Sequence, residues 1–469
     1  MNKRFFITVL LFLIIGMKAF SNAGLETVDG RGFWSETARV FIDDTLPELN
    51  ADKVDRGERI KGVVYFEGFD FTHYDSESKG IEPMLDETYV LLKEFYAAEN
   101  QPDKKPVPFV FLGHSQGGLR SVAMSTYLKN KDPVLYKQLK GVVTFSGIDK
   151  GLKLLENKGA NFRARVYTDV SILSDGIYGT FKVLDFTPTD FISDLILNGI
   201  YKNVFSNALY CVGDFVLCTC LGVTKGFAYP ILNNAGWNNY AQIRDMCPQS
   251  DFVKKYVLEE KPYYYKVPSG TTLEIVWKRG WLGIPYPTLE RRTVYSTVQT
   301  TDANMKVDKN LPLNFIIGGY NDSLSMADEN TRNNIDKGMK IAGDVFNGAY
   351  IAHIAKCCLL IGLFTNSPVY ATDCNRAADW CYNYKREINE LIGESANDGL
   401  VAVSSQQLPE YSKVGSSAQT KVLNKTNRII YNDCNHENIN KVGSASRNKI
   451  NDYADELLGI KNRTNKKRK

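Results

Sequence analysis

Short apolar runs alternate with amphipathic segments in the first third of the chain. Residues 61–69, 109–112 and 141–145 are apolar runs next to Gly or Pro, as is typical of buried strands. Residues 82–100 and 117–129 lie between them and carry apolar side chains at helical spacing. The order strand, helix, strand, helix, strand predicts an α/β fold with a mostly parallel central sheet flanked by helices.

The alternation stops at residue 152, and the sheet pattern resumes only at 313–318. In between, residues 170–232 are rich in Phe, Tyr, Leu and Ile with few charges, which predicts apolar helices inserted above the sheet. Residues 262–298 are rich in Tyr, Trp, Val and Thr with Pro and Gly turns, which predicts a hairpin. The segment 152–310 is therefore interpreted as a lid or cap, with a second hydrophobic core as the alternative.

A second, mostly helical insertion is predicted at residues 323–394. It contains an apolar segment at 341–364 and a polar one at 377–392, both with helical patterns. Two short apolar runs, 400–403 and 428–431, then close the sheet pattern.

The N-terminus has the pattern of an export signal. Lys3 and Arg4 precede an uncharged run at 5–17, and small residues stand just before Gly24. The run is shorter than the roughly 20 residues that span a bilayer. We therefore predict a cleaved signal peptide at 1–23 and a secreted or periplasmic protein, with an uncleaved anchor or a buried helix as the alternatives.

The formal charge of +4 is concentrated at the two ends of the chain. The leader 1–23 has three basic residues and the tail 461–469 has six, and neither has an acidic one. Subtracting these nine charges from the formal +4 leaves about −5 on residues 24–460. This body comprises the two halves of the core, 24–151 and 311–460, and the insertions. Such a body offers no broad surface for phosphates, so nucleic acid is not an expected partner.

The chain has nine Cys, all after residue 210. In an exported protein they permit disulfides, and Cys374 and Cys381 are candidates to join a loop to a helix. Alternatively, several of them are small buried apolar residues. No Cys pair has the His spacing of a zinc site.

Gly113-His114-Ser115-Gln116-Gly117 has the pattern G-x-S-x-G between a predicted strand and a predicted helix. This context identifies Ser115 as a nucleophile raised on a sharp strand-to-helix turn, as in α/β-hydrolases. Glycines at the turn remove Cβ atoms where backbone segments come close, and the helix N-terminus favours the negative charge of acyl transfer.

Ser115 needs a base to take its proton, and the chain has four His. His73 precedes the nucleophile, His114 adjoins it as a packing or hydrogen-bonding neighbour, and His353 lies in an apolar insertion. His436, which follows the last predicted strand, remains as the base.

Two carboxylates are candidates for the acid that orients the base. Asp322 follows the predicted strand 313–318, where strand counting places this residue. Asp398 lies in Asn397-Asp398-Gly399, ahead of a Leu-Val pair. On its position alone, a generic hydrolase interpretation would choose Asp322.

Residues 395–401, Ser-Ala-Asn-Asp-Gly-Leu-Val, and 435–440, Asn-His-Glu-Asn-Ile-Asn, resemble the acid and base segments of secreted bacterial triacylglycerol lipases. Gly-His-Ser-Gln-Gly-Gly at 113–118 is similar to their nucleophile loop, and the resemblance covers 61–151 and 311–460. It implies that Asp398 is the acid.

The same resemblance implies an oxyanion hole formed by the backbone N–H groups of Gln116 and Phe69. Here Glu67-Gly68-Phe69 replaces the family's His-Gly pair. The family also binds a structural calcium beside the base loop, where Glu437 or Asp433 would have to serve in this chain. Calcium is thus a candidate structural ion, and the chemistry requires no cofactor.

Together these features predict an exported serine hydrolase that cleaves carboxylic esters of lipids through an acyl-enzyme, a lipase or esterase. The apolar segment 170–232 favours a lid that meets a lipid interface, and the basic tail would suit anionic headgroups. The alternatives are a phospholipase or thioesterase with the same triad, or a catalytically silent binding protein.

Overall fold

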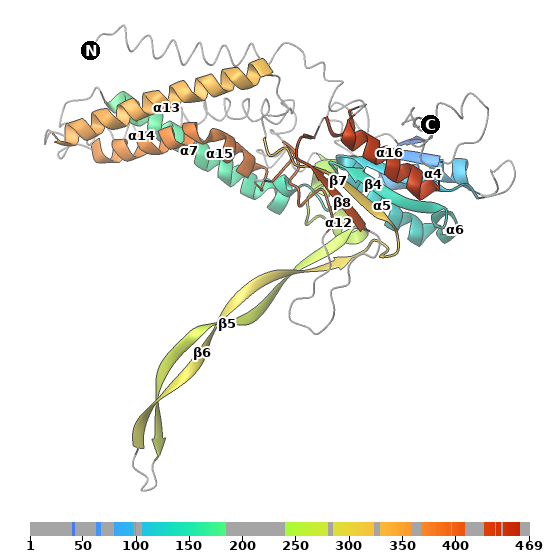
Figure 1. Ribbon diagram of the computed structural model, residues 1–469, viewed down its shortest axis with the longest axis horizontal. Helices are drawn as coiled ribbons and strands as arrows, with labels where there is room; N and C mark the ends of the chain where they lie inside the picture. Colours follow the sequence, from blue (N-terminus) through green and yellow to red (C-terminus); the bar gives the residue numbers. More distant parts are fainter. Residues whose placement is uncertain are drawn as a thin grey trace, which may run out of the picture.

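In the computed structural model the chain is described over residues 40–42, 62–66, 79–97, 99, 106–183, 240–279, 285–322, 329–358, 367–394, 396–408, 426–436, 438–441 and 444–459. Within these ranges lies a six-stranded sheet in the order β1-β2-β3-β4-β7-β8 (Figure 1). Its strands are β1 (Val40–Ile42), β2 (Gly62–Phe66), β3 (Phe109–His114), β4 (Leu139–Phe145), β7 (Leu313–Gly318) and β8 (Thr426–Tyr431).

β1 runs antiparallel to β2, and the other neighbouring strands of this sheet are parallel. Strand order follows chain order, so each connection joins neighbouring strands. Because β3, β4, β7 and β8 are parallel, their carboxyl ends meet at one edge of the sheet. The predicted α/β fold with a mostly parallel sheet is confirmed.

The sheet separates two hydrophobic layers because successive side chains of a strand point to opposite faces. Val64, Phe66, Phe111 and others pack with α4 (Ile81–Tyr96) and α5 (Gln116–Lys131) on one face. Val63, Leu112 and their neighbours pack with α16 (Ala445–Leu458) on the other. Helices therefore cover both faces, as predicted for a sheet of mostly parallel strands.

Side chains cap the starts of two flanking helices. Ser444 accepts a hydrogen bond from the backbone N–H of Arg447 at the start of α16, and Gly459 ends that helix in a left-handed conformation. At the start of α4 the Ile81 N–H donates to Asp245, which lies in α11 (Ala241–Asp245), at 2.7 Å. The segment that returns from the first insertion is thereby fixed to the core.

The two inserted segments form one helical body. α7 (Ala160–Lys182) belongs to the first insertion, while α13 (Glu329–Cys358), α14 (Ser367–Tyr382) and α15 (Tyr384–Leu391) belong to the second. A Cβ at Gly176 of α7 would clash with Ala377 of α14, so these helices touch closely. The body extends to one side of the sheet (Figure 1). The apolar helix predicted at 341–364 begins earlier than expected, at Glu329. The polar helix predicted at 377–392 is interrupted at Asn383, between α14 and α15.

The hairpin predicted at 262–298 is confirmed and is longer at both ends. β5 (Leu258–Arg279) pairs antiparallel with β6 (Pro285–Met305), with an irregularity between Pro268 and Gly270. It projects as a twisted two-stranded ribbon away from the sheet (Figure 1). α12 (Asp251–Tyr256) packs on the core directly before it.

Residues 400–403 do not form a closing strand, in contrast to 426–431. Gly399 has φ 98°, and the side chain of Asp398 accepts the N–H groups of Leu400 and Val401. These two N–H groups are thus used in a turn and are unavailable to a neighbouring strand. Within this loop Asn397 and Ala402 form an isolated bridge.

The candidate pair Cys374 and Cys381 does not join a loop to a helix. Cys374 and Cys381 are free thiols on the same helix, α14, and both are buried. Seven residues of helix separate Cα atoms by about 10 Å, which is beyond the reach of a disulfide. The other cysteines in the described ranges, Cys247, Cys357, Cys358 and Cys434, are also free. The alternative prediction, small buried residues, fits most of them.

Several predicted segments lie outside the described residues: the leader 1–23, the oxyanion candidate Phe69, His73, much of the apolar segment 170–232, Glu437 and the tail 461–469. Over the ranges that are described, we find no helix long and apolar enough to cross a membrane.

Candidate active site

Ser115 is the single residue between the end of β3 and the start of α5, and its backbone has a conformation that L-residues seldom adopt. Its φ is 54° and its ψ is −125°. Its carbonyl accepts hydrogen bonds from the N–H groups of Gly118 and Ile148, both at 3.0 Å. A non-Gly residue in such a region carries about 1–3 kcal/mol of strain. The turn is held from two sides, which keeps this strained conformation in place.

The glycines around Ser115 are required by close approaches. A Cβ at Gly113 would clash with the carbonyl oxygen of Gly117, and a Cβ at Gly118 would stand 2.7 Å from Cα of Gly147. Only Gly allows β3, the turn and the first turn of α5 to meet in this way. The role predicted from the sequence for glycines at this turn therefore has a physical basis at Gly113.

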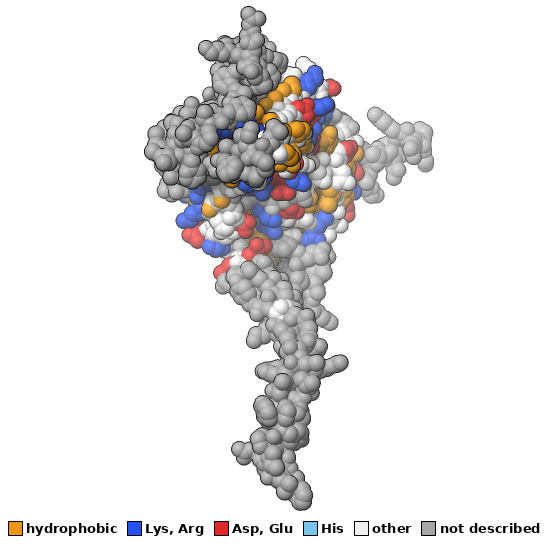
Figure 2. Space-filling view, turned by 90° about the vertical axis from the view of Figure 1, so that its left-hand side faces the viewer, with side chains coloured by type: hydrophobic (Ala, Val, Ile, Leu, Met, Phe, Trp, Pro, Cys, Tyr) orange, Lys and Arg blue, Asp and Glu red, His pale blue; other side chains and the backbone are white. Residues whose placement is uncertain are grey.

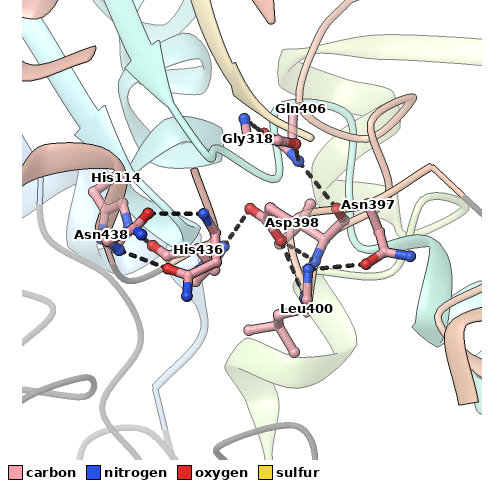
Figure 3. A network of polar contacts seen from close by, with 11 residues as sticks. His114, Gly318, Asn397, Asp398, Leu400, Gln406, His436 and Asn438 are labelled. Carbon is pink, nitrogen blue, oxygen red and sulfur yellow. Dashed lines mark hydrogen bonds and ion pairs between the residues drawn. The ribbon is translucent and has the colours of Figure 1, made fainter. Parts of the chain in front are cut away.

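His436 and Asp398 form a fully buried pair (Figure 3). Nδ1 of His436 lies 2.7 Å from Oδ2 of Asp398, and the His436 N–H donates to the Asp398 carbonyl at 2.8 Å. An ionised carboxylate only accepts hydrogen bonds, so Nδ1 carries the proton of the neutral ring. The basic nitrogen is then Nε2, on the far side of the ring from Asp398.

The Asp398 carboxylate is held in a tight turn. Its Oδ1 accepts from the N–H groups of Leu400 at 3.1 Å and Val401 at 2.7 Å, while Oδ2 meets His436. The left-handed Gly399, at φ 98°, makes this turn, and its N–H donates to the Asn397 side chain at 2.9 Å. The carboxylate therefore has one oxygen fixed by backbone and the other aimed at the imidazole.

The turn of Asp398 lies at the carboxyl end of β7. Gln406 accepts from the N–H of Gly318 at 2.8 Å and donates to the carbonyls of Gly318 and Val401, both at 3.0 Å. A Cβ at Gly318 would stand 2.7 Å from Cβ of Asp398. Asp398 thus occupies the position that strand counting assigns to an acid after this strand.

The two ends of the second insertion are joined beside this turn. The Asn321 N–H donates to the Asn397 carbonyl at 2.8 Å, and the Asn397 N–H donates to the Asn321 side chain at 2.9 Å. Asp322, the other acid candidate, follows in a half-exposed loop. Because the insertion begins and ends at the same place, Asp398 reaches the end of β7 despite its distance along the chain.

The loop that carries His436 is braced by reciprocal hydrogen bonds. The Asn435 N–H donates to the Asn438 side chain at 2.7 Å, and the Asn438 N–H donates to the Asn435 side chain at 2.8 Å. These bonds fix the backbone on both sides of His436. They give a physical role to Asn435 and Asn438.

His114, next to Ser115, contacts His436 as well (Figure 3). Its Nε2 lies 2.9 Å from the His436 carbonyl oxygen, and its ring stacks on Phe145 with centroids 5.3 Å apart. Burial, and secondarily the nearby His436, lower the pKa of His114 to about 3. His114 is therefore neutral at ordinary pH and is a packing and hydrogen-bonding neighbour, as predicted.

Gln116, the predicted oxyanion donor after Ser115, is the first residue of α5 and is fully buried. Its side chain donates to the side-chain oxygen of Gln242 in α11 at 2.8 Å. Gln242, Gln406 and Gly318 shape the site but were not singled out from the sequence. Their contacts join segments far apart in the chain, and no local motif marks them.

His353 lies in the helical body, where its Nε2 is 2.8 Å from the Gly179 carbonyl oxygen of α7. It is buried between helices, as expected for a residue of an apolar insertion. Over the described part of the chain no group of three His, Cys, Asp or Glu side chains could hold a metal ion. Asp433 belongs to that part, whereas Glu437 lies outside it.

Comparison of the chain with protein-family models, with curated proteins and with solved structures found no match. The site combines a strained Ser at a strand-to-helix turn with a buried His–Asp pair whose backbone contacts the neighbour of that Ser.

Proposed function

We propose that the protein is an exported serine hydrolase of the α/β-hydrolase fold, similar to secreted bacterial triacylglycerol lipases, that cleaves carboxylic esters of lipids. The observation that carries the proposal is the buried His436–Asp398 pair, with 2.7 Å between Nδ1 and Oδ2, bonded to the residue preceding Ser115. Nucleophile, acid and base follow one another along the chain in the order that this fold requires.

In the proposed reaction Ser115 Oγ attacks the ester carbonyl carbon while His436 Nε2 takes the hydroxyl proton. Asp398 keeps the imidazole in the required tautomer and stabilises the imidazolium. The proton then passes to the leaving alkoxide, and an acyl-Ser115 ester remains. Water, activated by His436 in the same way, hydrolyses that ester and restores the free hydroxyl.

The oxyanion of each tetrahedral intermediate would be stabilised by the backbone N–H of Gln116 at the start of α5. A second N–H is assigned to Phe69 on the resemblance to the lipase family. The Gln116–Gln242 hydrogen bond supports this role for Gln116, because it fixes the first turn of the helix. Donors that are fixed in advance stabilise developing charge without reorganisation.

The helical body is proposed to cap the acyl site. Its helices are inserted after β4 and β7, whose carboxyl ends lie at the same edge of the sheet as Ser115. On α13 the exposed apolar side chains Ile341, Val345, Ile351 and Ile354 suit contact with a lipid interface. Figure 2 shows apolar side chains among charges of both signs over the described part of one face. Such a mixed surface suits a lipid or ester substrate better than a polyanion.

The experiment is hydrolysis by the mature protein of p-nitrophenyl esters of increasing acyl length, a triacylglycerol emulsion, a phospholipid and an acyl thioester. We expect turnover of carboxylic esters that is lost in Ser115→Ala. A preference for phospholipid or thioester would change the substrate class. Equal rates for the parent and Ser115→Ala, or no hydrolysis of any substrate, would contradict the proposal.

Export is part of the proposal and has its own test. Cleavage of the leader predicts that the mature chain begins near Gly24. N-terminal sequencing of protein recovered from medium or periplasm checks this. A cytosolic protein that retains the leader would contradict it.

A further inference from the structure

The backbone of His436 is held on one side by the acid of the proposed triad and on the other by the residue that precedes its nucleophile. Its N–H donates to the carbonyl of Asp398 at 2.8 Å, and its carbonyl oxygen lies 2.9 Å from Nε2 of His114. His114 is the last residue of β3 and directly precedes Ser115. The base is thus tied to the acid by one backbone group and to the nucleophile strand by the other.

His114 is itself firmly placed. Its ring stacks on Phe145, the last residue of β4, with centroids 5.3 Å apart and planes 20° from parallel. β3 and β4 are paired there, with His114 opposite Phe145. A side chain fixed by the sheet in this way provides a rigid reference for the loop that carries His436.

The contact also defines the state of His114. A carbonyl oxygen only accepts hydrogen bonds, so Nε2 of His114 carries a proton. Burial lowers the pKa of His114 to about 3, so the ring is neutral when catalysis occurs. Its centroid lies 5.1 Å from that of His436, and a neutral ring there adds no repulsion when His436 becomes an imidazolium.

We infer that His114 is a positioning residue for the base: its Nε2–H holds the His436 carbonyl and so sets the place of His436 relative to Ser115. This inference rests on the proposed function. Proton transfer from Ser115 needs heavy atoms about 2.6–3.2 Å apart. A displacement of about 1 Å can reduce turnover by about 10²-fold.

Three variants separate positioning from stability. His114→Phe keeps an aromatic ring against Phe145 and removes the donor. His114→Gln loses the ring but keeps an N–H at the same number of bonds from Cα. His353→Phe is the matched control, because His353 is a buried His bonded through Nε2 to a carbonyl oxygen, at 2.8 Å, within the helical body.

On p-nitrophenyl acetate we expect His114→Phe to lower kcat about 10²-fold with little change in KM, and His114→Gln to restore most of kcat. His353→Phe should retain the parent kcat. In the Asp398→Asn background the loss from His114→Phe should largely disappear, because residues that act as a unit have non-additive effects. The downfield NMR signal of the His436 Nδ1 proton should be weakened by His114→Phe and kept by His114→Gln.

The inference is overturned if folded His114→Phe has the parent kcat and the parent NMR signal. It is also overturned if His114→Gln is as slow as His114→Phe, or if His353→Phe is equally slow. The activity of the parent protein distinguishes a failure of the role inferred for His114 from a failure of the proposed function. If it hydrolyses the ester with Ser115 while His114→Phe is unaffected, only the role of His114 fails. If the parent is inert, the proposed function fails and the inference fails with it.

Discussion

Nδ1 of His436 lies 2.7 Å from Oδ2 of Asp398, although 38 residues separate the two along the chain. Both side chains are completely buried. An amide in place of the carboxylate would no longer stabilise the imidazolium or specify its tautomer, and such a change typically costs about 10⁴-fold in turnover. We therefore expect Asp398→Asn to lose activity by orders of magnitude.

Asp322→Asn is the matched control for that substitution, because Asp322 lies in the half-exposed loop after β7. We expect it to retain nearly the parent rate. The measurement is turnover of one soluble ester by both variants, with folding checked by circular dichroism. A large loss in Asp322→Asn with an active Asp398→Asn would move the acid to Asp322.

Gly318 leaves room for Asp398. A Cβ there would stand 2.7 Å from Cβ of Asp398, 3.0 Å from Oγ of Ser146 and 3.1 Å from the Cys434 carbonyl oxygen. Gly318→Ala must shift the acid, the base loop or both, so we expect a loss in turnover of about 10-fold or more.

Gly348 provides the comparison for Gly318, since a Cβ at this position of α13 meets nothing within 4 Å. Gly348→Ala should keep the activity and stabilise the protein by about 0.5–1 kcal/mol, the usual gain for Ala over Gly in a helix. Rates and denaturant midpoints of both variants decide the matter. Normal turnover in Gly318→Ala would show that the close contact between β7 and the acid turn does not limit turnover.

The strain at Ser115 predicts a conflict between stability and function. Ser115→Gly and Ser115→Ala both remove the nucleophile, but only Gly adopts φ 54° without strain. Relief of the backbone strain stabilises the Gly variant by about 1–3 kcal/mol. The greater conformational freedom of its unfolded chain destabilises it by about 0.4–1 kcal/mol. We therefore expect the free energy of unfolding, measured by chemical denaturation, to be about 1 kcal/mol higher for Ser115→Gly than for Ser115→Ala. A less stable Gly variant would contradict a strained turn.

Asp169 in α7 predicts a pH-dependent stability of the helical body. Burial raises its pKa to about 6, an effect that Arg165 only partly offsets. Because the folded protein holds this proton more tightly than the unfolded chain, Asp169 makes stability fall as pH rises from about 4 to about 6.

Asp169→Asn removes that titration and keeps the shape of the side chain. The parent should therefore lose unfolding free energy relative to Asp169→Asn across this pH range, as measured by denaturation at several pH values. A constant difference between the two proteins, or a difference that favours the parent as pH rises, would argue against the raised pKa.

The core of the fold and the nucleophile turn could be predicted because their signals are local. Apolar runs beside amphipathic segments specify β2, β3, β4 and their helices, and glycines around Ser115 mark a close strand-to-helix turn. Residues 400–403 were expected to close the sheet, but the Asp398 side chain takes two of their N–H groups. A side-chain hydrogen bond of this kind leaves no trace in hydrophobic periodicity.

Contacts between distant segments could not be predicted. Strand counting favoured Asp322 because it follows β7 directly, and the Asn321–Asn397 hydrogen bonds that bring Asp398 to the same place have no sequence pattern. The same holds for the Gln116–Gln242 contact and for the joining of both insertions into one helical body.

Covalent labelling tests most directly whether Ser115 is an activated nucleophile. The mature protein would be treated with a fluorophosphonate, and its intact mass and proteolytic peptides measured. We predict one label on the peptide that contains Ser115, none on Ser115→Ala, and slower labelling of Asp398→Asn. An unlabelled parent protein, or a label on another residue that persists in Ser115→Ala, would contradict the account.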